Sequence, residues 1–239
     1  MSGHSRRRTA ELPQGRLLAE ISLWSADLGH LADEIGRVEE VVDMFHIDAS
    51  DGHFSPALLF FPDLVAVVRR LSAKPIHVHL MATDDILVEQ IDQFAAAGAD
   101  LISIHAENKH IDAALVALDE RGVEAGLVLQ LDTPIAVAAP YLHRISEITL
   151  LGTRIGLKGQ DLDQRAHARL QAARALLDGQ GSGMRIIVAA DGGIREHTVA
   201  GLRKAGADAV VLGSLAFDAK DVVERVRWVQ TLGYGAESA

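Results

Sequence analysis

The chain has 239 residues, of which 49% are hydrophobic, 23% are charged and 4% are aromatic. It contains no cysteine, which excludes a disulfide scaffold, a cysteine zinc site, an iron–sulfur cluster and a thiol nucleophile. With 23 basic and 33 acidic residues the net charge is −10, so a surface for nucleic acid is not expected. No apolar run approaches the roughly 20 residues of a membrane span. We therefore expect a soluble, cytoplasmic chain without a membrane partner.

The first 16 residues differ in composition from the rest of the chain. Arg6, Arg7 and Arg8 stand in a polar stretch that ends at Pro13 and Gly15, and no apolar run of a signal peptide follows them. We expect residues 1–16 to form a flexible basic tail, with a segment that docks on a partner subunit as the alternative. Residues 17–239 remain for a folded domain.

From Leu17 onward, short apolar or β-branched runs alternate with longer, alanine-rich amphipathic stretches. The apolar runs predict strands at residues 18–23, 43–48, 75–80, 101–105, 124–129, 147–151, 185–190 and 209–212. The amphipathic stretches predict helices near residues 28–40, 62–72, 84–97, 109–121, 134–141, 163–178, 196–205 and 219–231. Several of the helices close on a glycine, which suits the left-handed position after a helix.

Eight strand–helix units over about 215 residues predict an α/β fold, a single closed (β/α)8 TIM barrel that occupies residues 17–239. The strands are apolar throughout, as in a parallel sheet that is buried on both faces. The alternative is an open doubly wound sheet, which usually has fewer strands and a GxGxxG turn after its first strand. Here the first strand runs into SLWSADL, and no glycine follows until Gly29. This favours the barrel.

Polar residues of unusual kinds follow the predicted strands, where barrel enzymes carry their chemistry. Residues two apart share one face of a strand, which pairs His46 with Asp48 and His77 with His79. Asp191 ends the seventh strand. Imidazoles and carboxylates that converge on one mouth predict either a divalent-metal site or a set of general acids and bases.

Other polar residues near the same strand ends are less informative. His105 ends the fourth strand, and its role stays open between the site and the pairing of a backbone group. We expect Asp27 to cap a helix and Asp51 and His53 to shape a loop.

Glycine-rich segments follow three neighbouring strands. LGTRIGLKGQDL comes after the sixth strand, DGGI after the seventh and LGSLAF after the eighth. Backbone amides of glycine loops bind phosphate without side-chain charge, and barrels often use the loops after strands 7 and 8 for this purpose. The sequence therefore predicts a small phosphorylated substrate.

The segments SLWSADL, FHIDASDGHFSP, HVHLMA, IHAE, GLVLQLDTP, AADGGI and VLGSLAF occur in this order between Glu20 and Asp218. Together they resemble the ribulose-phosphate 3-epimerase family, whose members interconvert D-ribulose 5-phosphate and D-xylulose 5-phosphate on a (β/α)8 barrel. The resemblance implies one divalent metal ion (Zn, Fe, Mn or Co) and a homo-oligomer, since relatives are commonly dimers or hexamers. Matched position by position, the metal ligands are His46, Asp48, His79 and Asp191.

The resemblance also implies a mechanism and a substrate site. Asp48 and Asp191 would act as paired acid and base on opposite faces of C3, through a cis-enediolate whose charge the metal ion stabilises. Ser22 and His79 would contact the substrate, and Met81 would lie near the metal. The expected phosphate contacts are Gly156, Lys158, Gly159, Gln160, Gly192, Gly193, Gly213 and Ser214.

Several positions depart from the family pattern. The family usually has methionine at Ser50 and asparagine at Ala57, and often aspartate at His77. Lys158 replaces a glycine of the phosphate loop, either as a cationic contact or as a solvent-exposed side chain. Two bulky residues, Phe61 and Trp24, could crowd the mouth. An alternative function is therefore the epimerisation of another ketose phosphate, such as allulose 6-phosphate.

Two alternatives change the class of function. Related phosphate-binding barrels that act as lyases or aldolases typically carry Asp-x-Lys-x-x-Asp at strand 2, whereas this chain reads Asp48-Ala49-Ser50-Asp51 without a lysine. A Schiff-base aldolase would need a lysine inside the barrel, for which Lys158 is the candidate near strand 6. A non-catalytic relative is the other alternative, and the altered phosphate loop is its main support.

Overall fold

The computed structural model describes residues 7–180 and 185–233. In these residues eight parallel strands pair in chain order and close into a barrel, because β8 pairs with β1. The strands are β1 Leu18–Ser22, β2 Met44–Ser50, β3 Ile76–Met81, β4 Leu101–His105, β5 Glu124–Leu129, β6 Glu147–Leu151, β7 Ile187–Asp191 and β8 Ala209–Leu212. The predicted (β/α)8 barrel is confirmed.

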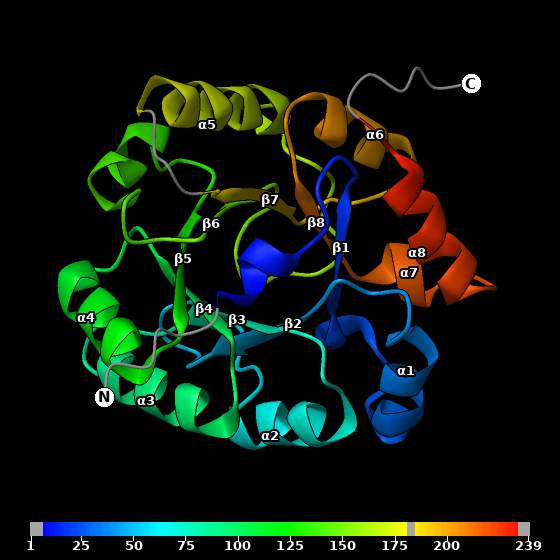
Figure 1. Ribbon diagram of the computed structural model, residues 1–239, viewed down its shortest axis with the longest axis horizontal. Helices are drawn as coiled ribbons and strands as arrows, with labels where there is room; N and C mark the ends of the chain where they lie inside the picture. The colour runs from blue at the N-terminus through cyan, green and yellow to red at the C-terminus, as the bar shows by residue number, and fades with distance from the viewer. Residues whose placement is uncertain (1–6, 181–184, 234–239) are drawn as a thin grey trace.

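The helices form an outer ring around the strands (Figure 1). They are α1 Leu31–Val38, α2 Pro62–Leu71, α3 Leu87–Ala97, α4 Ile111–Arg121, α5 Ala166–Gln180, α6 Glu196–Lys204, α7 Ser214–Phe217 and α8 Val222–Thr231. Helices α3 and α4 end at Gly98 and Gly122, whose φ angles of 106° and 67° lie in the left-handed region. The ring buries apolar side chains between helices and strands, and this layer is the main core of the protein.

Two of the predicted helices differ in detail from the expectation. The segment expected as an amphipathic helix at residues 134–141 is a 3₁₀ helix, η4 Ile135–Tyr141, which contains Pro140. Proline removes a helical N–H donor, so a regular α-helix is disfavoured there. The helix expected from residue 28 begins with a 3₁₀ segment, η3 Leu28–His30, before α1, and another 3₁₀ segment, η2 Leu23–Ser25, precedes it. Asp27 caps η3 by accepting from the Gly29 amide at 2.9 Å, as expected.

In the described part of residues 1–16, where we expected a flexible basic tail, the chain contacts the barrel. A 3₁₀ helix, η1 Arg8–Glu11, lies across the centre of the barrel in Figure 1. The Thr9 amide donates to the buried Glu124 carboxylate at 2.9 Å, and the Thr9 hydroxyl donates to the same carboxylate. Arg8 also contacts Asp100 at 3.3 Å. These donors pair the Glu124 carboxylate, which would otherwise be buried without hydrogen bonds. Through this contact the segment covers the N-terminal end of the barrel. Residues 1–6 lie outside the described residues.

The barrel interior changes from apolar to polar along its axis. At the end closed by η1 it is filled by an apolar cluster of Leu12, Leu18, Met44, Ile187, Ala189 and Ala209. Further along the strands the inward-facing residues become Glu20, His46, His77 and Glu147, all fully buried. The polar residues therefore concentrate toward the C-terminal mouth. In the described part of the chain, every helix is too short or too polar to cross a membrane.

Candidate active site

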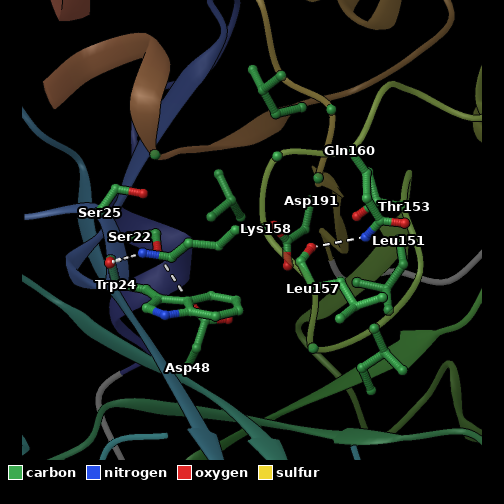
Figure 2. Close-up of a pocket in the computed structure, with 18 of the residues that line it drawn as sticks. Ser22, Trp24, Ser25, Asp48, Leu151, Thr153, Leu157, Lys158, Gln160 and Asp191 are labelled. Carbon is green, nitrogen blue, oxygen red and sulfur yellow. Dashed lines mark hydrogen bonds between the residues drawn. The ribbon is translucent and has the colours of Figure 1, made fainter. Parts of the chain in front are cut away.

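The C-terminal ends of the strands surround a cavity of about 320 Å³ (Figure 2). Its walls come from β1, β2, β3, β6, β7, β8 and the loops that follow them. Both aspartates singled out in the sequence, Asp48 and Asp191, line this cavity. The residues expected to contact substrate line it too, namely Ser22, His79, Met81, Gly156, Lys158, Gly159, Gln160, Gly192, Gly193, Gly213 and Ser214.

Four residues bring ligand atoms together beneath the cavity. His46, Asp48, His79 and Asp191 each offer one nitrogen or oxygen atom, and these atoms lie within 4.8 Å of one another. The register explains the cluster, since Asp48 pairs with His79 across β2 and β3 and His46 stands two residues earlier on the same face. Asp191 approaches from β7, and its carboxylate lies 3.7 Å from His79 Nδ1. Two imidazoles and two carboxylates suit Zn, Fe, Mn or Co.

The orientation of His46 tests whether this cluster fits a metal ion. His46 Nδ1 lies 3.1 Å from Glu20, so this nitrogen carries the proton and donates to the carboxylate. His46 Nε2 faces the cluster, 3.4 Å from Asp48, and has no hydrogen-bond partner in the described residues. Burial lowers the pKa of His46, but Asp48 raises it well above its ordinary value. The position at Nε2 therefore attracts positive charge, as a cation site should.

The two aspartates have opposite electrostatic environments. Burial raises the pKa of Asp48, but the charge of His46 and the neighbouring imidazole of His79 hold that pKa well below its usual range. The Ser22 hydroxyl also donates to Asp48 at 2.8 Å. Burial raises the pKa of Asp191, and the nearby Asp48 charge raises it further. Two carboxyls whose pKa values are pushed apart are suited to opposite roles in proton transfer.

The family model of the ribulose-phosphate 3-epimerase family matches residues 18–217, from β1 to the end of α7. The chain belongs to this family. A ribulose-phosphate 3-epimerase from Synechocystis sp. is 33% identical over 87% of this chain and 91% of its own length. The Bacillus subtilis enzyme of the same name is 32% identical over 86% of this chain and 96% of its own length.

Solved structures of other barrels show the same fold at low identity. A 3-hexulose-6-phosphate synthase from Salmonella typhimurium has a TM-score of 0.66 and 17% identity, over 90% of this chain and 98% of its own. An orotidine 5'-phosphate decarboxylase from Pyrococcus horikoshii has a TM-score of 0.61 and 17% identity, over 89% of this chain and 97% of its own. These likenesses support the barrel and carry no argument about activity.

Beneath the cluster lies a polar layer that includes His77, the position where the family often has aspartate. His77 Nδ1 lies 2.8 Å from Glu20 and its Nε2 lies 2.7 Å from the Ser103 hydroxyl. Burial raises the pKa of Glu20, but His77 and His46 outweigh it and lower that pKa to about 2. Glu20, His46 and His77 could be read as a second metal site. However, both ring nitrogens of His77 already have partners, so His77 has no free nitrogen for an ion, and the layer supports His46 from below.

Sequence reasoning missed Glu20 and Glu147 in this layer. Burial and the charge of Glu20 raise the pKa of Glu147 well above its ordinary value. The Thr149 hydroxyl donates to it at 2.8 Å. The two-residue period of a strand could have revealed Glu20, because Glu20 and Ser22 share one face of β1. The same inward face of the next strands, β2 and β3, carries His46 and His77.

The loop after β6 reaches across the mouth to the loop after β1. Lys158 donates to the Trp24 carbonyl, and its Nζ stands 4.7 Å from the centre of the Trp24 ring (Figure 2). The Gln160 side chain donates to the carbonyls of Arg154 and Leu157, both at 2.8 Å, and so holds the loop together. Trp24 lines the cavity as expected, whereas Phe61 is 61% exposed and does not line it.

The loop after β7 needs its glycines. Gly192 and Gly193 have φ angles of 89° and 71°, and a Cβ on Gly193 would lie 2.7 Å from the Leu162 backbone. Two arginines that the sequence analysis did not single out, Arg154 and Arg195, also line the cavity. The backbone turn and these cations form a wall suited to an anion. Asp51 accepts from the amides of its own loop, including His53 at 2.8 Å, which is the expected structural role.

Proposed function

We propose that this protein is a metal-dependent 3-epimerase that interconverts D-ribulose 5-phosphate and D-xylulose 5-phosphate. The observation that carries the proposal is the pair Asp48 and Asp191, which reach one cavity from the non-adjacent strands β2 and β7 beside two imidazoles. Family membership supports the same reaction, since relatives at 32–33% identity bear the name ribulose-phosphate 3-epimerase.

The two carboxyls perform the proton transfers in this proposal. Inversion at C3 requires one group to remove the proton from one face and another to deliver a proton to the opposite face. Asp48, whose pKa is held low, is ready as the base, and Asp191, whose pKa is raised, is ready as the acid. The roles exchange in the reverse direction. Ser22 donates to Asp48 and fixes the carboxylate that faces the substrate.

His46, Asp48, His79 and Asp191 would hold the metal ion. A divalent ion there would supply Lewis-acid stabilisation of the negative charge that develops as the C3 proton leaves. His46 and His79 present a ring nitrogen to the ion, and Glu20 keeps the other nitrogen of His46 protonated. The family's use of a divalent metal and the unpartnered His46 Nε2 support this assignment.

The phosphate of the substrate would bind at the opposite wall of the cavity. There the backbone of Gly192, Gly193, Gly213 and Ser214 and the loop from Gly156 to Gln160 offer amides. Lys158 adds a cation within the same wall, and its contact with Trp24 keeps it over the cavity. We assign Lys158 to phosphate binding on this ground.

A panel of ketose phosphates tests the proposed substrate. The purified protein should invert C3 of D-ribulose 5-phosphate, with a higher kcat/KM than for allulose 6-phosphate. A higher kcat/KM for allulose 6-phosphate would move the assignment to this second candidate substrate. The second candidate is favoured by the Lys158–Trp24 contact at the mouth, because both residues depart from the family pattern. If the protein inverts C3 of none of the ketose phosphates in the panel, the proposal is contradicted.

Aldol and decarboxylation chemistry is less well supported by the residues present. The Lys158 amine is engaged with the Trp24 carbonyl in a loop over the mouth rather than on a strand inside the barrel. A Schiff base would require this amine to reach the substrate carbonyl. Borohydride treatment with substrate should therefore leave Lys158 unmodified.

We also propose that the protein is a homo-oligomer. The loop between β2 and α2 exposes Leu58 and Phe61, at 79% and 61% of their surface. Neighbouring apolar side chains with this exposure are typical of contact surfaces between proteins. Sedimentation equilibrium should give a multiple of the 25.6 kDa chain mass, and a monomer at micromolar concentration would contradict this expectation.

A further inference from the structure

His105, whose role the sequence left open, lies directly behind the proposed metal ligand His79. The Nε2 atoms of His79 and His105 are 2.8 Å apart. His105 Nδ1 lies 2.9 Å from a carboxylate oxygen of Glu107. Both imidazoles are buried, and the other nitrogen of His79, Nδ1, faces Asp48 at 3.3 Å. The three side chains thus form a continuous line from Glu107 to the metal cluster.

The hydrogen bonds along this line determine where each proton lies. Glu107 accepts from His105, so the proton of His105 is on Nδ1. The free lone pair of His105 Nε2 then accepts from His79 Nε2–H. This leaves the lone pair of His79 at Nδ1, the atom that faces Asp48 and Asp191.

Glu107 is itself held in place from the neighbouring strand. Its second oxygen accepts from the Gln130 amide at 3.1 Å and from the Thr133 hydroxyl, both just beyond β5. The backbone amide of His105 is paired separately, with Asn108 at 3.2 Å. The His105 ring is therefore not needed to satisfy its own backbone, and its two polar contacts both lie along the line to His79.

We propose that Glu107 and His105 form a positioning relay that fixes the ring orientation and the tautomer of His79, so that His79 Nδ1 is presented to the metal ion. Partners of this kind raise the basicity of a ligating histidine, and their loss typically weakens metal binding about 10- to 100-fold. The inference rests on the proposed metal site and adds two residues to it that do not touch the substrate.

The test measures metal affinity rather than turnover. Full-length metal-free protein is titrated with Zn²⁺ in competition with a chromophoric chelator, and the Co²⁺ absorption spectrum reports the ligand geometry. The variants are His105→Phe, which breaks the relay, and His105→Gln, which keeps an acceptor for His79 and a donor for Glu107. Glu107→Gln removes only the carboxylate charge. His143→Gln is the matched control, because His143 is exposed and outside the cavity.

The relay predicts that His105→Phe weakens Zn²⁺ binding about 10- to 100-fold and alters the Co²⁺ spectrum. Smaller losses are expected for Glu107→Gln and His105→Gln, and none for His143→Gln. If His105→Phe does not fold, Glu107→Gln decides the question. Wild-type affinity in both His105→Phe and Glu107→Gln would overturn the relay and leave the metal site intact. Failure of the wild-type protein itself to bind an ion would overturn the metal site together with the relay.

Discussion

Asp48 and Asp191 stand on the non-adjacent strands β2 and β7, yet a carboxylate oxygen of one lies within 4.8 Å of a carboxylate oxygen of the other. Closure of the barrel produces this approach, because β1 and β8 curve between them and direct both strand ends to one cavity. The pKa of Asp48 is lowered and that of Asp191 is raised. A single small substrate can therefore meet two carboxyls that differ in their affinity for a proton.

Metal removal should abolish activity. The four-residue cluster predicts about one divalent ion per chain in the purified protein, measured by plasma mass spectrometry. Dialysis against a chelator should remove both the ion and C3 inversion, and added Zn²⁺, Mn²⁺, Fe²⁺ or Co²⁺ should restore inversion. A metal-free protein that retained full turnover would contradict the proposed site.

Lys158→Met should weaken substrate binding. A charge-assisted hydrogen bond to phosphate contributes roughly 1.5–3 kcal/mol, so KM for D-ribulose 5-phosphate should rise about 10-fold or more, with a smaller change in kcat. Lys158→Arg should keep most of the affinity, because it retains the cation. Lys204→Met, which removes an exposed lysine of α6, serves as the control. An unchanged KM in Lys158→Met would show that this lysine does not bind the phosphate.

Glu147→Gln should stabilise the protein increasingly as the pH rises. The pKa of Glu147 is raised in the folded protein by burial and by Glu20. Above about pH 4.5 the unfolded chain loses this proton while the folded protein keeps it, so wild-type stability falls by at most about 1.4 kcal/mol per pH unit until the folded pKa is reached. The glutamine variant does not titrate. In urea unfolding from pH 5 to 8, the free energy of unfolding of Glu147→Gln should exceed that of wild type by an amount that grows with pH. Glu120→Gln, on the exposed face of α4, should show no such difference.

Thr9→Ala should destabilise the protein, because η1 is part of the fold. The substitution removes the hydroxyl that donates to the buried Glu124 carboxylate, which costs roughly 1–3 kcal/mol. Thr9→Ser keeps the hydroxyl and should lose less. Urea unfolding measures both variants. Equal free energies of unfolding for Thr9→Ala and wild type would mean that the hydrogen bond from the Thr9 hydroxyl does not stabilise the closed end of the barrel.

The strands could be predicted because they depend on local patterns, and the resemblance to the family then selected His46, Asp48, His79 and Asp191 among the polar residues at the strand ends. Apolar runs placed the eight strands to within about two residues, and the period of two put His46 and Asp48 on one inward face. The C-terminal position of polar residues then located the mouth of the barrel. The left-handed glycines Gly98 and Gly122 likewise marked the ends of α3 and α4.

The contacts that the sequence did not reveal join residues far apart in the chain. Thr9 meets Glu124, and Lys158 meets Trp24, across 115 and 134 positions. Glu20 looked like an isolated charge in an apolar strand until β2 and β3 placed two imidazoles beside it. The N-terminal segment looked polar and unstructured because the contact of Thr9 with Glu124, far along the chain, is not visible in composition.

The central claim is that Asp48 and Asp191 serve opposite faces of one carbon, and hydrogen–deuterium exchange at C3 tests it most directly. Metal-loaded wild type, Asp48→Asn and Asp191→Asn are incubated in D₂O with each epimer, and NMR follows the C3 proton. We predict that each variant loses inversion by roughly 10²- to 10⁴-fold and exchanges only one epimer, a different one for each variant. Near wild-type inversion by Asp191→Asn, or exchange of both epimers by a single variant, would contradict the claim.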